Sequence, residues 1–165
     1  MTCSVTYLLK EHGWAECSIQ TDGAIVRLLA SHLHDSLDDL LRATVSVVHG
    51  ARDARVLFMD EPGEYRLLMD RIENDTVRLR VIAFDQSFSR SKDDDGRMVF
   101  SSECRLRTFA GAVLSAAQRL LQDHGVDGYR QHWNHEFPKD GVDRLKEALR
   151  SKRMGRELPD ATTNG

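Results

Sequence analysis

The sequence lacks disulfide spacing, long apolar runs and targeting features. Its three cysteines, Cys3, Cys17 and Cys104, are widely spaced with no Cys-x-x-Cys pair, which is typical of reduced thiols in a cytosol. The near-apolar run within VTYLLKEHGW covers five residues, too few for a signal-peptide core or a membrane span. These absences predict a cytoplasmic protein that has no membrane partner.

Motifs for common cofactors and nucleophiles are also missing. There is no Walker loop, no Gly-x-Gly-x-x-Gly after a strand and no Gly-x-Ser-x-Gly elbow, so we expect no bound cofactor. A formal net charge of −3 argues against a general nucleic-acid binder. Arg66, Arg78 and Arg80 are expected on the outer face of a sheet beside Asp70, where cross-strand charge pairs explain them without a ligand.

The composition is that of an ordinary globular protein. With 165 residues, 41% hydrophobic and 30% charged, the chain is long enough to bury one core without staples. No repeat or linker interrupts it. We therefore expect a single domain over residues 1–154. The remaining residues, 155–165, have little to bury and are expected to form a disordered tail.

The strands follow from alternation of apolar and polar residues. The segment WAECSIQ, the turn TDG and the segment AIVRLLASHL predict a hairpin. Three further strands, RVLFMD, EYRLLMDRI and TVRLRVIAFD, are joined by short turns, which favours an antiparallel meander. A polar loop, residues 86–97, precedes a last strand, MVFSSECRLR, in which Met98, Phe100 and Cys104 are expected to point inward.

Three helices complete the pattern. One begins at Asp35 or Ser36 and ends at Gly50, a second spans residues 109–124, and Asp140 is expected to cap a third. The apolar stripe of the second helix is expected to be buried: Val113, Leu114, Ala117, Leu120 and Leu121. The order ββ-α-βββ-β-α-α predicts an α+β domain. Its expected architecture is a single curved antiparallel sheet of about six strands, with helices mainly on one face.

The stretch ASHLHDSLDDLL concentrates two histidines and three aspartates. His32 and His34 share a face if they lie on a strand, but a zinc site needs two further ligands. Asp35, Asp38 and Asp39 suit the cap and first turn of a helix, where carboxylates favour the positive end of the dipole. We therefore interpret this stretch as a helix start and expect no metal there.

The other candidate chemical groups have similar explanations. His132, His135 and Glu136 depart from the His-Glu-x-x-His pattern, and a surface helix with Trp133 and Phe137 buried explains them better than a metal. Glu61 and Glu64 flank a turn, where we expect solvated carboxylates. Cys104 is expected to be a buried, inert thiol, and no catalytic residue is predicted.

A family resemblance gives the functional hypothesis. The segments EPGEYRLLMDR and VRLRVIAFD, preceded by SLDDLLRA, resemble those of small bacterial α+β proteins, some of which look like immunity proteins of polymorphic or contact-dependent toxins. The resemblance covers roughly residues 14–124 as an order of elements. It implies a non-enzymatic protein that binds another protein, such as a toxin, through acidic patches.

Five aspartates are the candidates for such a partner-binding surface: Asp93, Asp94, Asp95, Asp38 and Asp39. The first three lie in the 86–97 loop, which is longer than a strand connection requires. A solvated loop and a helix cap are the structural explanations for the same residues. The alternative class of function is a small enzyme or ligand-binding protein whose site is assembled from residues distant in sequence. The sequence leaves the oligomeric state open.

Overall fold

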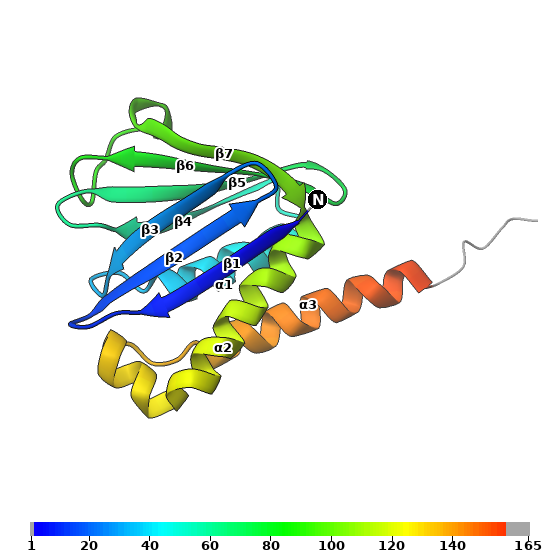
Figure 1. The fold of residues 1–165 in the computed structure, drawn as a ribbon. Helices are drawn as coiled ribbons and strands as arrows, with labels where there is room; N and C mark the ends of the chain where they lie inside the picture. The colour runs from blue at the N-terminus through cyan, green and yellow to red at the C-terminus, as the bar shows by residue number, and fades with distance from the viewer. Residues whose placement is uncertain (1, 158–165) are drawn as a thin grey trace, which may run out of the picture.

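The computed structural model describes residues 2–157, with side chains described through residue 151 (Figure 1). It contains seven strands, one short 3-10 helix (η1) and three α-helices. In chain order the elements are β1 (Cys3–Leu9), β2 (Trp14–Thr21), β3 (Ile25–Ser31), α1 (Ser36–Val48), β4 (Asp53–Met59), β5 (Glu64–Glu73), β6 (Thr76–Phe84), η1 (Asp93–Asp95), β7 (Arg97–Arg105), α2 (Leu106–Trp133) and α3 (Lys139–Glu157). The α+β class predicted from the sequence is confirmed.

The strands form two antiparallel sheets instead of the single sheet that the sequence predicted. One has the order β1-β2-β3 and the other β4-β5-β6-β7. Within each sheet every strand pairs with its neighbour in sequence. The break falls at α1, which separates β3 from β4, and those two strands do not pair. Figure 1 shows the smaller sheet crossing in front of the larger one.

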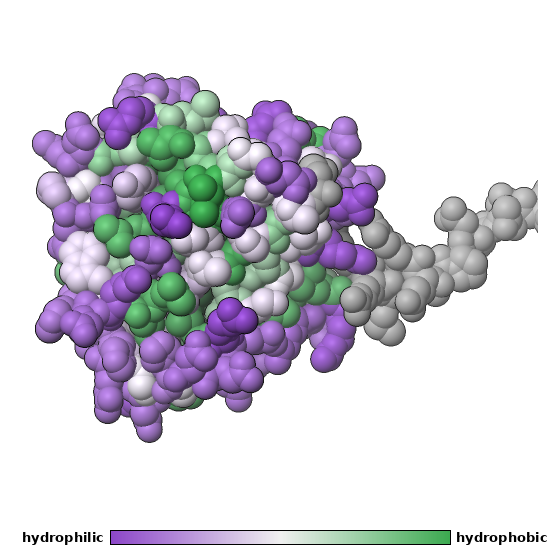
Figure 2. Space-filling model, viewed as in Figure 1, coloured by the Kyte–Doolittle hydropathy of each residue, from purple (hydrophilic) through white to green (hydrophobic). Residues whose placement is uncertain are grey.

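The first strand, β1, was missed by the sequence analysis. Its inward residues are Val5 and Tyr7, and its register with β2 places Val5 opposite Ile19 and Tyr7 opposite Cys17. The outer face of this sheet keeps Leu8, Ile25 and Leu29 exposed. Figure 2 shows apolar patches separated by polar side chains on the corresponding side of the molecule.

The inward alternation predicted for β7 holds only in part. Phe100 and Cys104 are buried, but Met98 is 58% exposed, so its predicted inward position is wrong. The register with β6 shifts between Val81 and Ile82, so that Phe100 pairs with Val81 while Met98 pairs with Ile82. Such an irregularity inserts one residue and turns the side chains beyond it to the other face.

The two sheets and three helices share one apolar core. Among the helices, α1 packs mainly against β4 and α2 mainly against β1, while the helices also contact one another. The hydroxyls of Thr21 and Ser102, 2.7 Å apart, join the sheets. A second hydrogen bond, 2.7 Å between Tyr7 Oη and Ser36 Oγ, ties the smaller sheet to α1. No helix among residues 2–157 is long and apolar enough to cross a membrane.

The second and third helices have boundaries that differ from the predicted ones. The helix predicted over 109–124 begins at Leu106, and the backbone is non-helical at Gly125, where φ is 67°, before helical structure resumes to Trp133. Helix α3 begins at Lys139, so Asp140 lies in its first turn and is not the cap. It extends to Glu157, past residue 155 where we placed the tail. Residues 158–165 of that predicted tail lie outside the described part of the chain.

The stripe predicted for the second helix is buried except at its margin. Val113, Ala117 and Leu120 are buried and Leu114 is partly buried, but Leu121 is 37% exposed, against the prediction.

We expect Leu120→Ala to lower the free energy of unfolding by about 2–5 kcal/mol, because it leaves a cavity. The adjacent Leu121→Ala is the control and should cost less than about 1 kcal/mol. Urea unfolding measures both, and equal losses would contradict this packing.

Candidate partner-binding surface

A buried arginine organises the loop between β6 and β7. Arg66, on β5, is only 3% exposed. Its Nη1 donates to the backbone carbonyl of Ser91 and to Asp93 Oδ1, both at 2.8 Å, and its Nη2 donates to the carbonyl of Ser89 at 2.9 Å. The guanidinium carbon also lies 3.9 Å from the centroid of the Phe84 ring. One side chain therefore fixes three points of the loop.

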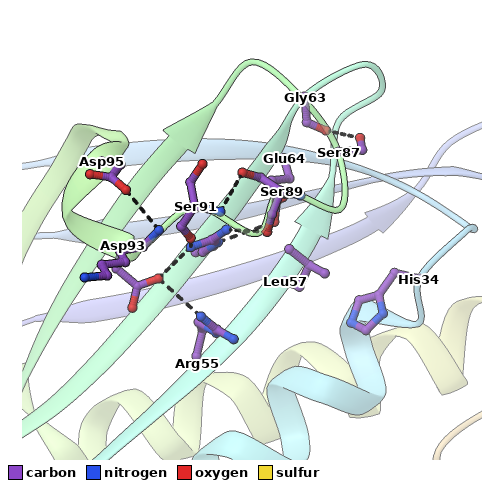
Figure 3. Close-up of polar contacts among 12 residues, drawn as sticks. His34, Arg55, Leu57, Gly63, Glu64, Ser87, Ser89, Ser91, Asp93 and Asp95 are labelled. Atoms are coloured by element: carbon purple, nitrogen blue, oxygen red, sulfur yellow. Dashed lines mark hydrogen bonds and ion pairs between the residues drawn. The ribbon is translucent and has the colours of Figure 1, made fainter.

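Glu64 is the second residue that holds this loop. It is 2% exposed, and its Oε2 accepts from Arg66 Nε at 3.4 Å. Its Oε1 accepts from the backbone N–H of Ser89 at 2.6 Å (Figure 3). The two oxygens of one carboxylate thus bind the arginine and the loop, which leaves neither charge unpaired in the interior.

Two further contacts hold the loop, one to the β4–β5 turn and one to the outer face of the larger sheet. The hydroxyl of Ser87 donates to the carbonyl of Gly63 at 2.6 Å. At the other end, a Cβ added at Gly96 would lie 2.3 Å from Cγ2 of Ile82, so the backbone approaches the sheet more closely than any other residue type allows. The loop is therefore held at both ends, although most of its residues are exposed.

The sequence analysis placed both residues of this pair wrongly. Glu64 was expected to be a solvated carboxylate and Arg66 an exposed member of an arginine face, yet both are buried. Arg78 and Arg80 do form the expected cross-strand ion pairs, with Glu103 and Asp70, each at 2.9 Å or less. Strand parity gives the correct face for Arg66, but parity contains no information about a loop that returns to cover that face.

The three loop aspartates have different environments. Asp93 Oδ1 lies 2.8 Å from Arg66 and 3.3 Å from Arg55. Burial raises the pKa of Asp93, but the hydrogen bonds and charges of the two arginines outweigh burial and hold this pKa below its usual value. Asp95 Oδ2 accepts the backbone N–H of Lys92 at 3.1 Å, as Figure 3 shows. Asp94 is exposed and has no polar contact within residues 2–151.

An exposed aromatic side chain, which the sequence analysis did not single out, lies in the same loop. Phe88 is 67% exposed and has a left-handed backbone, with φ at 55°. Its neighbours Ser87 and Ser89 are both hydrogen-bonded to the β4–β5 turn or to Glu64. A left-handed phenylalanine is uncommon, and here the fixed serines on either side hold it in place.

Asp38 and Asp39, the other two predicted partner-binding residues, lie in the first turn of α1. Asp38 forms an ion pair with Arg42 at 2.9 Å. Asp39 Oδ2 accepts from the backbone N–H of Leu57 and from His34 Nε2, both at 3.0 Å. Asp35 is the N-cap and accepts from the N–H of Asp38, so this stretch is a helix start as predicted.

The two histidine groups, about 100 residues apart in sequence, meet beside this helix start. His135 Nε2 donates to the backbone carbonyl of His32 at 2.6 Å, and Trp133 Nε1 donates to Asp35 Oδ1 at 3.2 Å. Strand β3 ends at Ser31, so His32 and His34 lie beyond the strand on which they were expected. Within the described residues no three His, Cys, Asp or Glu side chains are arranged to hold a metal ion.

Two of the three cysteines, Cys17 and Cys104, lie in environments that keep the thiol protonated, whereas the hydrogen bond with Cys104 lowers the pKa of Cys3. Cys104 is buried. A hydrogen bond with Cys3, and then burial, raise the pKa of its thiol. Burial likewise raises the pKa of Cys17 to about 12. A thiol must ionise to act as a nucleophile, so both cysteines are poorly suited to catalysis at neutral pH.

The comparisons with known proteins give one structural similarity. No protein-family model matches the chain, and no curated protein matches it. A solved CdiA-CT/CdiI toxin and immunity complex from Enterobacter cloacae contains a chain similar to this one, with a TM-score of 0.44 and 10% identity. The match covers 69% of this chain and 99% of that chain.

The contacts of Arg66 predict that truncating its side chain strongly lowers the free energy of unfolding. Arg66→Ala leaves Glu64 buried without its charge partner and removes three anchors of the loop, so we expect a loss of about 3–5 kcal/mol in unfolding free energy. Arg80→Ala removes an ion pair with Asp70 from the same sheet, in which each side chain is about one-third exposed, and it should cost at most about 1 kcal/mol. Urea unfolding measures the difference. Amide exchange of residues 86–96 should increase only in the Arg66 variant.

The His34–Asp39 pair predicts a pH dependence. The hydrogen bond to Asp39 is the main reason that the pKa of His34 lies above its ordinary value of 6.5, and burial opposes the shift. Because folding raises this pKa, the stabilisation is complete below about pH 6.5 and disappears as the pH rises through the folded-state pKa. The stability lost in His34→Gln should therefore be larger at about pH 5.5 than at about pH 8.5. A difference of the opposite sign would contradict the pairing.

Proposed function

We propose that this protein acts by binding another protein through the surface of the β6–β7 loop, and that it is an immunity protein whose partner is a toxin. The observation that carries the proposal is a loop fixed from beneath by the buried Arg66–Glu64 pair while Phe88 remains exposed on top. The toxin as partner comes from the family resemblance of the sequence, and the loop geometry supplies the surface.

A fixed loop favours binding because its conformational entropy was already lost during folding. Mobile loops lose that entropy when a partner binds, whereas Ser87, Ser89, Ser91 and Asp93 are already held by the sheet. Aromatic side chains are enriched at the centres of protein interfaces, where they bury a large apolar area. Phe88 is the anchor that this arrangement presents.

Asp94 and Asp95 supply the acidic part of the proposed surface. Both are exposed, whereas the charge of Asp93 is neutralised by Arg55 and Arg66. Exposed carboxylates attract a cationic partner at long range and increase the association rate more than they slow release. A basic surface on the toxin is the expected complement. Involvement of Asp38 and Asp39 remains a prediction, since both carboxylates already have partners within this chain.

The biological test is protection. We expect a toxin gene to lie beside the gene for this protein. Cells that express its toxin domain should arrest growth, and co-expression of this protein should restore growth. Purified toxin domain and this protein should then co-elute as a complex. Growth arrest that persists despite soluble, folded protein would argue against the immunity function.

The loop residues are tested by association kinetics with that partner. Asp94→Asn combined with Asp95→Asn should lower the association rate by about fivefold or more at low salt and reduce its salt dependence. Asparagine preserves an oxygen that can accept the Lys92 N–H. The matched control is Asp123→Asn with Asp143→Asn, two exposed aspartates on the helices, which should leave the rate unchanged. Phe88→Ala should instead accelerate dissociation.

A further inference from the structure

A basic groove lies where α2 and α3 diverge. The helices pack together near their crossing and separate toward the start of α2 and the later turns of α3, as Figure 1 shows. The groove has a volume of about 440 Å³, within the range of ligand-binding clefts. Among the residues whose side chains are described, its lining is Arg107, Gly111, Leu114, Lys146, Leu149 and Arg150.

The lining combines three cations with an apolar floor. Leu114 and Leu149 are partly buried and pack against the core, so they present apolar surface between the charges. Lys146 and Arg150 are exposed and form no ion pair with any side chain of residues 2–151. The whole chain has a net charge of −3, so this local excess of positive charge does not follow from the overall composition.

Gly111 lines the groove on the α2 side. It lies inside α2, where glycine destabilises a helix relative to alanine. A Cβ added at Gly111 would meet no atom within 4 Å, so the fold itself does not require glycine there. Gly141 in α3 differs, because a Cβ there would lie 3.2 Å from Leu41. Glycine at position 111 exposes backbone to the groove, as is useful where a bound chain approaches closely.

We propose that this groove binds an acidic segment of a partner protein, with an apolar side chain of about leucine size between two carboxylates. The carboxylates would contact Lys146 and Arg150, and the apolar side chain would rest on Gly111, Leu114 and Leu149. Charge complementarity selects an acidic segment over a neutral or basic one. This site is separate from the β6–β7 loop and does not rest on the function proposed for that loop.

The probe is a fluorescein-labelled peptide of alternating glutamate and leucine, titrated with the full chain and followed by anisotropy. The same peptide with lysine in place of glutamate should not bind. Lys146→Glu combined with Arg150→Glu should weaken binding of the acidic peptide by about tenfold or more, because two attractive contacts become repulsive. Arg119→Ala, an exposed arginine of α2 outside the groove, should bind as the wild type does.

Gly111 distinguishes the groove from a diffuse basic surface. Gly111→Leu keeps every charge but fills the groove, so it should abolish saturable binding while circular dichroism shows an intact fold. Gly111→Ala, with a smaller side chain, should fold and bind with intermediate affinity. The proposal is overturned if Gly111→Leu or the charge-reversed variant binds like the wild type. It is also overturned if the acidic peptide fails to bind at up to about 1 mM.

Discussion

The ion pair between Arg66 and Glu64 is the interaction on which the outer face of the larger sheet depends. Two charges removed from water are costly unless each is hydrogen-bonded, and here the loop supplies the missing partners. The Arg66 guanidinium donates its remaining hydrogen bonds to the carbonyls of Ser89 and Ser91 and to the carboxylate of Asp93. The Glu64 carboxylate accepts its second hydrogen bond from the N–H of Ser89. The loop buries the pair, and the pair holds the loop.

This mutual dependence gives the loop aspartates separate roles. Asp93 is structural because its charge compensates Arg66 and Arg55. Asp95 closes the first turn of η1 and remains exposed, and Asp94 extends into solvent. A run of three identical residues in the sequence therefore becomes one internal ion-pair member and two surface charges. Phe88 is exposed in the same loop, between the hydrogen-bonded Ser87 and Ser89.

At the helix start at Asp35, too, polar groups are hydrogen-bonded by residues from distant parts of the chain. Trp133, at the end of α2, donates to Asp35, and His135, in the turn after α2, donates to the His32 carbonyl. Asp39 accepts a hydrogen bond from the N–H of Leu57 on β4. These contacts connect the β3–α1 turn to α2 and to the larger sheet. The clustered histidines and aspartates thus join elements of the fold.

The sequence by itself determined the α+β class, the antiparallel pairing of successive strands, the α1 start at Asp35 and the core residues Val113, Ala117 and Leu120. These features depend on local alternation, helical spacing and capping, which act between near neighbours. Only the tertiary structure decided that β3 and β4 do not pair, that Met98 and Leu121 are exposed and that Arg66 and Glu64 are buried. The reason is physical: alternation specifies which face of a strand a residue occupies, but what covers that face depends on contacts between segments far apart in the chain.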